Sequence, residues 1–350
     1  MLSPKVFINI VAWQSMHFLP DLLASIFQQT FHDFQVLVID NGSDDGVESF
    51  LRALYPTVII LRNARNLGFA PAHNQGIRYA LEHWRPEELS NCFILVTNPD
   101  TIWEMDFLEK LLSAALRHPS SGAFGGKLLR AYGENLQDEV LKETVHSDRF
   151  DSTGLSAHRS RSFTDRGAGE LDSGQYNQEE EVFGISGALA LYRASSLQDI
   201  RFSDEFFDPL FFSYKEDVDL AWRLRQAGWG ALYVPTAQAY HYRGMYMPEQ
   251  AGWLTRFRHR RGQSPERRYY STRNHLYLLV KNEHFFNFVL AWPWLLAKES
   301  GHFLYILFFE TRYLKAYAMA FWHLPKILKK RWARRVGTAV TAKDLRKWFK

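Results

Sequence analysis

The sequence contains one cysteine, Cys92, in 350 residues. A single thiol cannot form an internal disulfide, so a disulfide-stapled secreted fold is excluded and a reducing compartment is expected. The opening segment MLSPKVFINIVAW has no charged region before a long apolar stretch and no small-residue cleavage site, so no secretory signal is expected there. We therefore expect a cytoplasmic protein.

The sequence also lacks the apolar run of about 20 residues that a membrane-spanning helix needs. Its most apolar stretches, 285–297 and 303–309, are separated by KESGH. Acidic residues are scarce in the last 100 residues. Residues 251–350 carry 21 Lys/Arg and 5 Asp/Glu, whereas residues 1–250 carry 21 Lys/Arg and 33 Asp/Glu. Aromatics mixed with cations are typical of helices that lie on an anionic membrane surface.

That pattern predicts a helical, basic C-terminal region over 251–350, attached peripherally to the inner face of the plasma membrane. Two alternatives stay open, namely that these helices pack on the body or on a second subunit; the oligomeric state cannot be predicted. A nucleic-acid partner is not expected, because the body over 1–250 is strongly acidic and would repel a polyanion.

Strand-like and helix-like segments alternate over the first 130 residues. The pattern predicts strands over 6–13, 34–40, 57–63 and 92–98, and helices over 19–30, 47–55, 70–84 and 102–116. This alternation indicates βαβ units and an α/β fold with a mostly parallel sheet flanked by helices. Ligands of such sheets bind beyond the carboxyl ends of the strands.

The organisation changes after this region. Residues 131–181 are polar and poor in aliphatics, which indicates either a functional insertion, expected on the acceptor side, or a disordered segment, within a domain that spans 1–250. A strand or buried segment is expected over 183–193, a helix over 214–228 and a strand over 231–235.

Several carboxylates lie where chemistry could use them. Asp40 lies at the carboxyl end of one predicted strand, and Asp100 follows another. Asp40 could accept hydrogen bonds from a base or ribose, or belong to an ordinary turn. Asp100 suits a divalent metal that also binds phosphates, or could cap the following helix. Asp217 begins a helix after an apolar stretch, where it could be a general base or simply complement the helix dipole. His241 gains meaning only as a partner of Asp100.

No G-x-G-x-x-G fingerprint occurs, so a dinucleotide-binding fold of that type is not indicated. In NLGFAPAHNQG, Gly68 and Asn74 lie around the start of a helix whose free N–H groups could hold an anion. An ordinary helix start explains the same residues.

Taken in order, the motifs resemble those of family 2 glycosyltransferases of the GT-A fold, and among these the rhamnosyltransferase-like enzymes of bacterial surface-polysaccharide assembly. The resemblance covers about residues 5–245, with a weaker echo at YYSTRNHLYLLVKN. It rests on VAWQS, LLASIFQQTFHDFQVLVIDNGSDDG, NARNLGFAPAHNQGIRYA, TNPDT, FDSTG, FGISGALALYR and FFSYKEDVDLAWRLRQAGWGALYVPTAQAYHYRG.

The resemblance implies roles for particular residues. TNPD matches the metal-binding D-x-D element with Asn98 in place of the first Asp, so Asp100 would bind Mg²⁺ or Mn²⁺, with His241 as a second ligand. Asp217 would be the catalytic base, with Glu216 beside it. The nucleotide-sugar side would comprise Ala12, Trp13, Asp40, Asn41, Arg65, Asn66, Gly68, Asn74, Asn98 and Asp100. The acceptor side would comprise Ser186, Gly187 and Ala188.

The expected activity is transfer of a sugar, with inversion, from a nucleotide-diphosphate donor to a hydroxyl of a saccharide or lipid-linked saccharide. The resemblance favours L-rhamnose from a dTDP donor, and a UDP-hexose is the alternative. One base on the acceptor hydroxyl implies single displacement, because double displacement would need a second, nucleophilic carboxylate. A nucleotidyltransferase is disfavoured, since no glycine-rich basic loop follows the first strand. A non-catalytic nucleotide-sugar-binding module of a membrane complex stays open.

Overall fold

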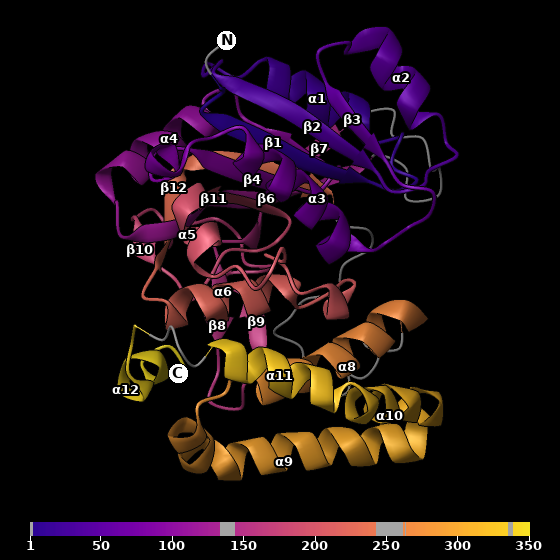
Figure 1. Ribbon diagram of the computed structural model, residues 1–350, viewed down its shortest axis with the longest axis vertical. Helices are drawn as coiled ribbons and strands as arrows, with labels where there is room; N and C mark the ends of the chain where they lie inside the picture. The colour runs from indigo at the N-terminus through magenta and orange to yellow at the C-terminus, as the bar shows by residue number, and fades with distance from the viewer. Residues whose placement is uncertain (1–2, 134–143, 243–261, 263, 335–338) are drawn as a thin grey trace.

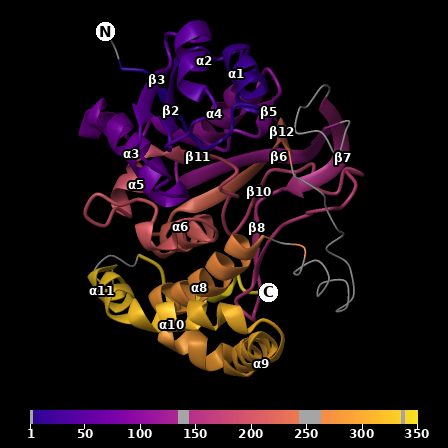
Figure 2. The ribbon, with the colours of Figure 1, turned by 90° about the vertical axis from the view of Figure 1, so that its right-hand side faces the viewer.

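The computed structural model describes residues 3–133, 144–242, 262, 264–334 and 339–350. Figures 1 and 2 show, from two sides, a twisted sheet with its helices in the upper part and the helices of residues 265–334 below it. The boundary expected at residue 250 lies outside the described residues, as does part of the insertion expected over 131–181.

The expected parallel sheet forms the N-terminal half. Its strands are β1 (Val6–Ala12), β2 (Phe34–Asp40), β3 (Ile59–Arg62) and β4 (Phe93–Thr97). The order is β4-β1-β2-β3, with every neighbouring pair parallel. The connecting helices are α1 (Leu19–Phe27), α2 (Val47–Leu54) and α3 (Phe69–Glu82). Helices cover both faces, so these strands are continuous apolar runs.

The second half of the sheet mixes directions. It contains β5 (Thr101–Trp103), β6 (Ser121–Gly133), β7 (Thr144–Ser152), β10 (Glu180–Glu181), β11 (Leu189–Arg193) and β12 (Gly230–Tyr242). The main path runs β10-β12-β6-β11-β4-β1-β2-β3. Strand β11 pairs antiparallel with both β4 and β6, and β12 runs parallel to β6. The sheet is thus parallel-rich, with antiparallel strands inserted beside β4.

One expected helix starts later than predicted. Residues 101–103 form β5, which pairs with β12, and helix α4 (Phe107–Arg117) begins only after Asp106. Asp100 therefore does not cap this helix, which removes the structural explanation considered for its carboxylate. The apolar Ile102 and Trp103 gave the appearance of a helical face but belong to a short strand.

The polar segment 131–181 contributes regular structure where it is described. Strand β7 pairs with β6, while β8 (Leu155–Ala157) and β9 (Phe163–Asp165) form a separate two-stranded sheet. Its polar residues therefore do not make it an extended loop, because strands with one solvated face tolerate alternate polar side chains.

The C-terminal region is helical, as expected. Two helices precede this region: α5 (Ala194–Asp199), beside β11, and α6 (Glu216–Gln226). The region itself contains α8 (Pro265–Asn282), α9 (Phe285–Phe309), α10 (Leu314–Trp322), α11 (Leu324–Arg334) and α12 (Ala342–Arg346). The two apolar stretches expected as separate segments form one 25-residue helix, α9, with Pro293 inside it. None of the described helices combines the length and the apolarity needed to cross a membrane.

Candidate functional site

The candidate site begins with the segment that leads into α6. Three non-glycine residues there adopt positive φ: Phe212 at 63°, Tyr214 at 70° and Lys215 at 70°. Such conformations cost of order 1–3 kcal/mol each and persist only where the surroundings enforce them. The start of α6, with Glu216 and Asp217, is therefore held in a geometry imposed by its neighbours.

The enforcing contacts come from α8. The side-chain Nδ2 of Asn274 lies 2.9 Å from the carbonyl oxygen of Phe211, 2.9 Å from that of Ser213 and 2.7 Å from that of Tyr214. Arg273 adds a hydrogen bond of 3.0 Å to the Phe211 carbonyl. Asn274 is fully buried, so no water can replace these donors. These hydrogen bonds from α8 thus hold the segment that leads into α6 in its strained conformation.

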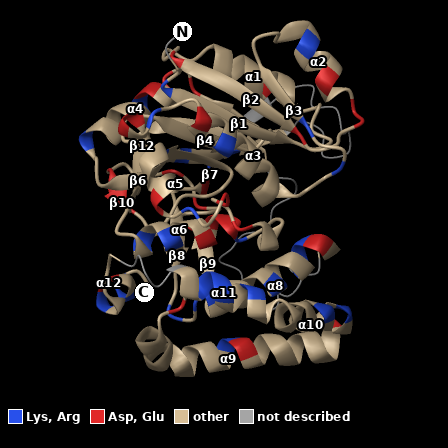
Figure 3. Ribbon diagram, in the orientation of Figure 1, with Lys and Arg blue, Asp and Glu red and all other residues tan. Residues whose placement is uncertain are grey.

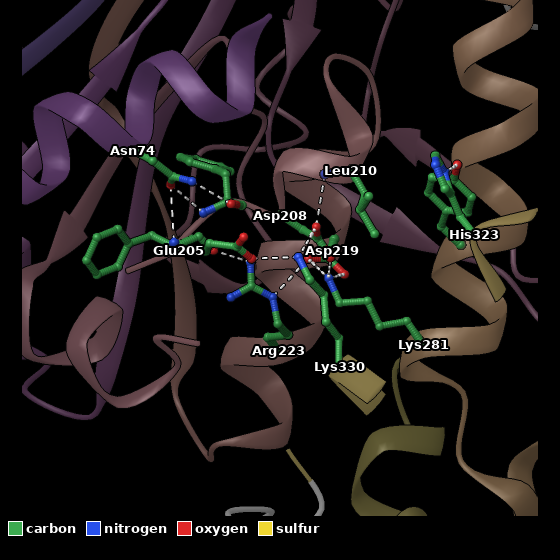
Figure 4. Close-up of polar contacts among 12 residues, drawn as sticks. Asn74, Glu205, Asp208, Leu210, Asp219, Arg223, Lys281, His323 and Lys330 are labelled. Atoms are coloured by element: carbon green, nitrogen blue, oxygen red, sulfur yellow. Dashed lines mark hydrogen bonds and ion pairs between the residues drawn. The ribbon is translucent and has the colours of Figure 1, made fainter. Parts of the chain in front are cut away.

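A buried ion cluster ties the same region to the C-terminal helices (Figure 4). Lys281 of α8 contacts Asp208 and lies 2.8 Å from Oδ2 of Asp219, which also pairs with Arg223 at 2.9 Å. Lys330 of α11 lies 2.6 Å from Asp208. Burial acts to raise the pKa of Asp208, but the two lysines outweigh it and lower the pKa to about 2. Helices α8 and α11 therefore pack on the body beside α6.

Asp217 lies at the first turn of α6, half-buried. Its Oδ2 accepts a hydrogen bond of 3.1 Å from the Gly187 N–H, and its Oδ1 accepts one of 2.7 Å from the Val218 N–H. Burial raises the pKa of Asp217 above its usual range, although these two N–H donors oppose the shift. A carboxylate with a raised pKa and a fixed orientation has the properties of a general base.

The turn over 186–188 joins this carboxylate to the tip of β4. The main-chain N–H of Asn98 donates to the carbonyl of Ala188 at 2.8 Å, one residue after Gly187 bonds to Asp217. A Cβ on Gly187 would lie 3.1 Å from the Cβ of Asp217, tighter than ordinary contact. The structure therefore brings the expected acceptor-side turn, the expected base and the TNPD segment together.

Asp100 and His241 meet as expected at the other side of that strand tip. His241 lies in β12, whose register places it opposite Thr101 of β5. Its Nε2 is 3.2 Å from Oδ1 of Asp100, and its Nδ1 is 2.7 Å from Oδ2 of Asp151. Burial acts to lower the pKa of His241, but the flanking Asp100 and Asp151 outweigh it and raise the pKa to about 10.

This arrangement fits a divalent metal that takes its other ligands from a diphosphate. Within the described ranges, no group of three or more His, Cys, Asp or Glu side chains is placed to hold a metal by itself. Mg²⁺, however, is commonly held by one or two carboxylates plus substrate phosphates. The contact of Asp151 with the far nitrogen of His241 has the form of a carboxylate that orients a metal-binding imidazole. The residues present thus fit the group, and Asp100 and His241 would be its protein ligands.

The residues expected at the nucleotide gather at the carboxyl ends of β1 and β2. Ala12 pairs with Asp40, and its carbonyl accepts a hydrogen bond of 2.8 Å from the Asn41 N–H. Trp13 follows, with 53% of its surface exposed. Asp40 is buried and accepts the Ser43 N–H at 2.8 Å. An open indole ring can stack on a base, and the fixed carboxylate beside it can accept hydrogen bonds from the base or its ribose.

Asn41 organises the neighbouring loop rather than facing solvent. Its Nδ2 donates to Oδ1 of Asn66 at 2.9 Å and to the carbonyl of Gly68 at 3.3 Å. Gly68 adopts φ +87°, and a Cβ there would lie 2.5 Å from the ring of Phe212. Arg65 is exposed on the same loop. The loop therefore reaches from the nucleotide side to the segment before α6.

Asn74 is buried, and its amide is engaged by the main chain. Its Nδ2 donates to the Phe207 carbonyl at 2.7 Å, and its Oδ1 accepts the N–H groups of Phe206 at 3.1 Å and Phe207 at 2.9 Å. Figure 4 shows it pointing toward this segment. In this structure Asn74 connects α3 to the residues before Asp208, and a direct nucleotide contact stays a prediction.

Glu216 points into the body, unlike Asp217. Its side chain is buried, and its Oε2 has no hydrogen-bond donor among the described residues. Burial, with a contribution from Asp217, raises the pKa of Glu216 well above its usual range. The buried position of Glu216 is consistent with the rule that adjacent helical residues do not share a face, and its catalytic role stays a prediction.

Three contributors were missed as individual residues. Asp151 lies in FDSTG and Asn274 in YYSTRNHLYLLVKN, segments that were noted only as part of the resemblance. Lys281, the penultimate residue of the second segment, was also missed. Only the fold shows which partner each of these residues contacts.

Comparison with known proteins identifies relatives of this chain. The family profile described as "Glycosyltransferase like family 2" matches residues 4–264. The N-acetylglucosaminyl-diphospho-decaprenol L-rhamnosyltransferase of Mycobacterium tuberculosis is 31% identical over 230 residues, covering 63% of this chain and 70% of that protein. The rhamnosyltransferase WbbL of Escherichia coli is 29% identical over 183 residues, covering 50% of this chain and 61% of that one.

Solved structures share the fold. A crystal structure of GalNAc-T7 with UDP, GalNAc and Mn²⁺ superposes with a TM-score of 0.55 at 12% identity, covering 79% of this chain and 48% of that one. Staphylococcus aureus TarS 1-349 in complex with UDP-GlcNAc superposes with a TM-score of 0.52 at 15% identity, covering 90% and 79%. At these identities the likeness concerns the fold alone.

Proposed function

Because this chain belongs to glycosyltransferase family 2, we propose that it transfers L-rhamnose from dTDP-rhamnose to a hydroxyl of a lipid-linked saccharide in cell-surface polysaccharide synthesis. The chain is a glycosyltransferase with a GT-A-like mixed α/β fold. The choice of rhamnose and of a lipid-linked acceptor is supported by the names of the two bacterial relatives.

One observation carries the proposal: the carboxylate of Asp217 is oriented by the Gly187 N–H beside the strand tip that bears Asp100. In the proposed reaction Asp217 accepts the proton of the acceptor hydroxyl as that oxygen bonds to the anomeric carbon. The bond from that carbon to the diphosphate oxygen breaks with its electron pair, so configuration inverts. A general base contributes typically 10²–10⁴-fold to such a step.

The donor lies, in this proposal, across the carboxyl ends of β1, β2 and β4. Trp13 stacks on the base, and Asp40 with the Asn41 loop binds the nucleoside. Asp100 and His241 hold Mg²⁺ or Mn²⁺, which when bound offsets the negative charge of the leaving diphosphate. Residues 186–188 border the acceptor hydroxyl, where Gly187 leaves room for a close approach to Asp217.

The test is a panel of sugar nucleotides, with Mn²⁺, Mg²⁺ or EDTA, read by thermal shift and by transfer to a synthetic lipid-diphosphate-linked N-acetylglucosamine. The expected result is metal-dependent stabilisation and turnover with dTDP-rhamnose. Turnover with a UDP-hexose instead would keep the enzyme class and replace the sugar. Stabilisation by a donor without transfer or donor hydrolysis would overturn the proposal in favour of a non-catalytic binding module.

A further inference from the structure

Helix α9 exposes an unusually apolar surface at the outer edge of the molecule. Thirteen of the 24 large hydrophobic side chains that are exposed in the structure lie on its 25 residues. Others continue onto α10, where Phe321 and Trp322 are 77% and 78% exposed. At 1.5 Å per residue the helix is about 37 Å long. Exposed apolar patches of this extent mark interaction sites.

The polar side chains of α9 point the other way. Its buried residues Asn287, Ala291 and Leu295 are spaced four apart and face the body. Its two charged residues also turn inward: Lys298 Nζ lies 3.3 Å from the Ser160 carbonyl, and Glu299 lies 2.9 Å from His275. Figure 3 shows α9 tan except for a single charged pair near its middle. The outer face of α9, which is described in full, therefore carries no exposed charge.

Cations surround this apolar face, whereas the acids near it are neutralised. Residues 282–350 contain 13 Lys/Arg and four Asp/Glu. Each of the four acids has a cationic partner in the structure: Glu283 with Arg161, Glu299 with Lys298, Glu310 with Arg268 and Asp344 with Lys347. Exposed cations around the face include Arg312, Lys315, Lys326, Lys329, Arg346 and Lys347. The field around the apolar face is thus positive.

A basic cavity opens at the N-terminal end of α9. It has a volume of about 500 Å³, and its lining combines Arg159, Arg346 and Lys347 with Leu290 and Trp294. The guanidinium of Arg159 lies 5.9 Å from the centre of the Trp294 ring. A lining that combines cations with exposed apolar side chains matches a phosphate head group that is joined to acyl chains.

We propose that the apolar outer face of α9 and α10 docks on an anionic lipid bilayer, with α9 in the plane of the interface and the basic cavity binding lipid phosphates. An aromatic face rimmed by cations is the arrangement of interfacial helices. A second copy of the chain fits less well, because two such faces would bring like charges together at the rim. The inference does not depend on the sugar, the metal or the base proposed above.

The test is flotation of the full-length protein with vesicles of phosphatidylcholine alone or mixed with phosphatidylglycerol. We expect binding to the anionic vesicles only, weakened by salt. The triple variant Phe308→Ser, Phe321→Ser and Trp322→Ser should weaken binding at least tenfold. The matched control Leu54→Ser and Leu116→Ser removes exposed leucines of α2 and α4 and should leave binding unchanged.

Two results would overturn the proposal. One is equal or absent binding to both vesicle types by the folded wild-type protein. The other is a dimer in solution that the triple variant dissociates, which would make a second copy the occupant. Thermal unfolding of each variant checks folding, and the altered side chains are exposed, so the midpoint should shift little. Quenching of tryptophan fluorescence by brominated lipids gives an independent readout of insertion.

Discussion

The main-chain N–H of Gly187 donates a hydrogen bond of 3.1 Å to Oδ2 of Asp217, and the absence of a side chain on Gly187 permits this approach. A Cβ there would lie 3.1 Å from the Cβ of Asp217 and 3.5 Å from the Phe69 ring. The glycine therefore sets both the orientation of the carboxylate and the space before it.

Gly187→Ala is expected to displace Asp217 by a few tenths of an ångström and to lower kcat by about 10- to 100-fold, because small misplacements of reacting groups are costly. Donor KM should change little. The matched control is Gly301→Ala on α9, where a Cβ would meet nothing within 4 Å; its kcat should equal that of the wild type. Steady-state kinetics of both variants decide the matter, and an unaltered kcat in Gly187→Ala would contradict the assigned geometry.

Asp217→Asn should reduce kcat by about 10²–10⁴-fold, the contribution of a general base, while donor binding measured by calorimetry is retained. Burial raises the pKa of Asp217, so the wild-type rate should fall as pH decreases through a value above the usual aspartate range. The residual rate of the variant should lack that acid limb. Loss of donor affinity, with kcat preserved, would assign Asp217 to the donor instead.

The same pKa shift has a consequence for stability. A carboxyl whose pKa is higher in the folded than in the unfolded state binds protons more tightly when folded, so its contribution to stability decreases as pH rises through that interval. At neutral pH the charged form is penalised by burial. Asp217→Asn removes this penalty, although its single amide oxygen can accept only one of the two N–H groups that bind the carboxylate. The melting temperature of the variant relative to wild type should therefore be higher at pH 7 than at acidic pH. Calorimetric melting curves across pH measure this difference.

The sequence was sufficient to predict the strands that carry the site, but not the contacts that hold the site in place. Asp40 and Asp100 each follow an apolar run, and because parallel strands end at one edge, their placement could be predicted. His241 was expected after a strand but lies within the 13-residue β12, since Pro235 looked like a stop. A register shift between Val234 and Gln238 accommodates that proline inside the sheet.

The contacts from the C-terminal helices could not be predicted, because they join residues 60 or more positions apart. Asn274 donates hydrogen bonds to the carbonyls of Phe211, Ser213 and Tyr214, and no local sequence pattern in α8 indicates those partners. The strain at Tyr214 is equally invisible, since β-turn statistics would place glycine at a positive φ. Tertiary contact overrides local preference here, and it does so beside the proposed base.

Asn274→Ala should leave the Ser213 and Tyr214 carbonyls without their buried donor, at about 1–3 kcal/mol for each one that finds no new partner, whereas the Phe211 carbonyl keeps its hydrogen bond from Arg273. We expect a lower melting temperature together with a kcat that falls more than donor KM changes, because the start of α6 loses its fixed position. The matched control is Asn287→Ala, which removes another buried amide that donates to the Ala342 carbonyl at 2.8 Å. That variant should lose stability while kcat is preserved. Equal effects of the two variants on kcat would show that Asn274 contributes only stability.

A variant of Asp151 tests the proposed metal site through a residue that is not itself proposed as a metal ligand. Its Oδ2 lies 2.7 Å from Nδ1 of His241, and a carboxylate in that position fixes the imidazole and strengthens it as a ligand. Asp151→Asn should weaken Mn²⁺ binding in the presence of nucleotide by about 10- to 100-fold, measured by electron paramagnetic resonance of free Mn²⁺.

The control for Asp151→Asn is Asp172→Asn, which alters a carboxylate of the same polar segment that pairs with Lys127 at 2.6 Å. It should leave Mn²⁺ affinity unchanged, since neither group contacts His241. Asp151 is buried beside Arg130, 3.8 Å away, so we expect its variant to lose stability as well. Affinities are therefore compared at a temperature where circular dichroism shows both proteins folded. Mn²⁺ affinity that is equal to wild type in folded Asp151→Asn would mean that Asp151 orients His241 for packing and that the cation, if bound, has other ligands.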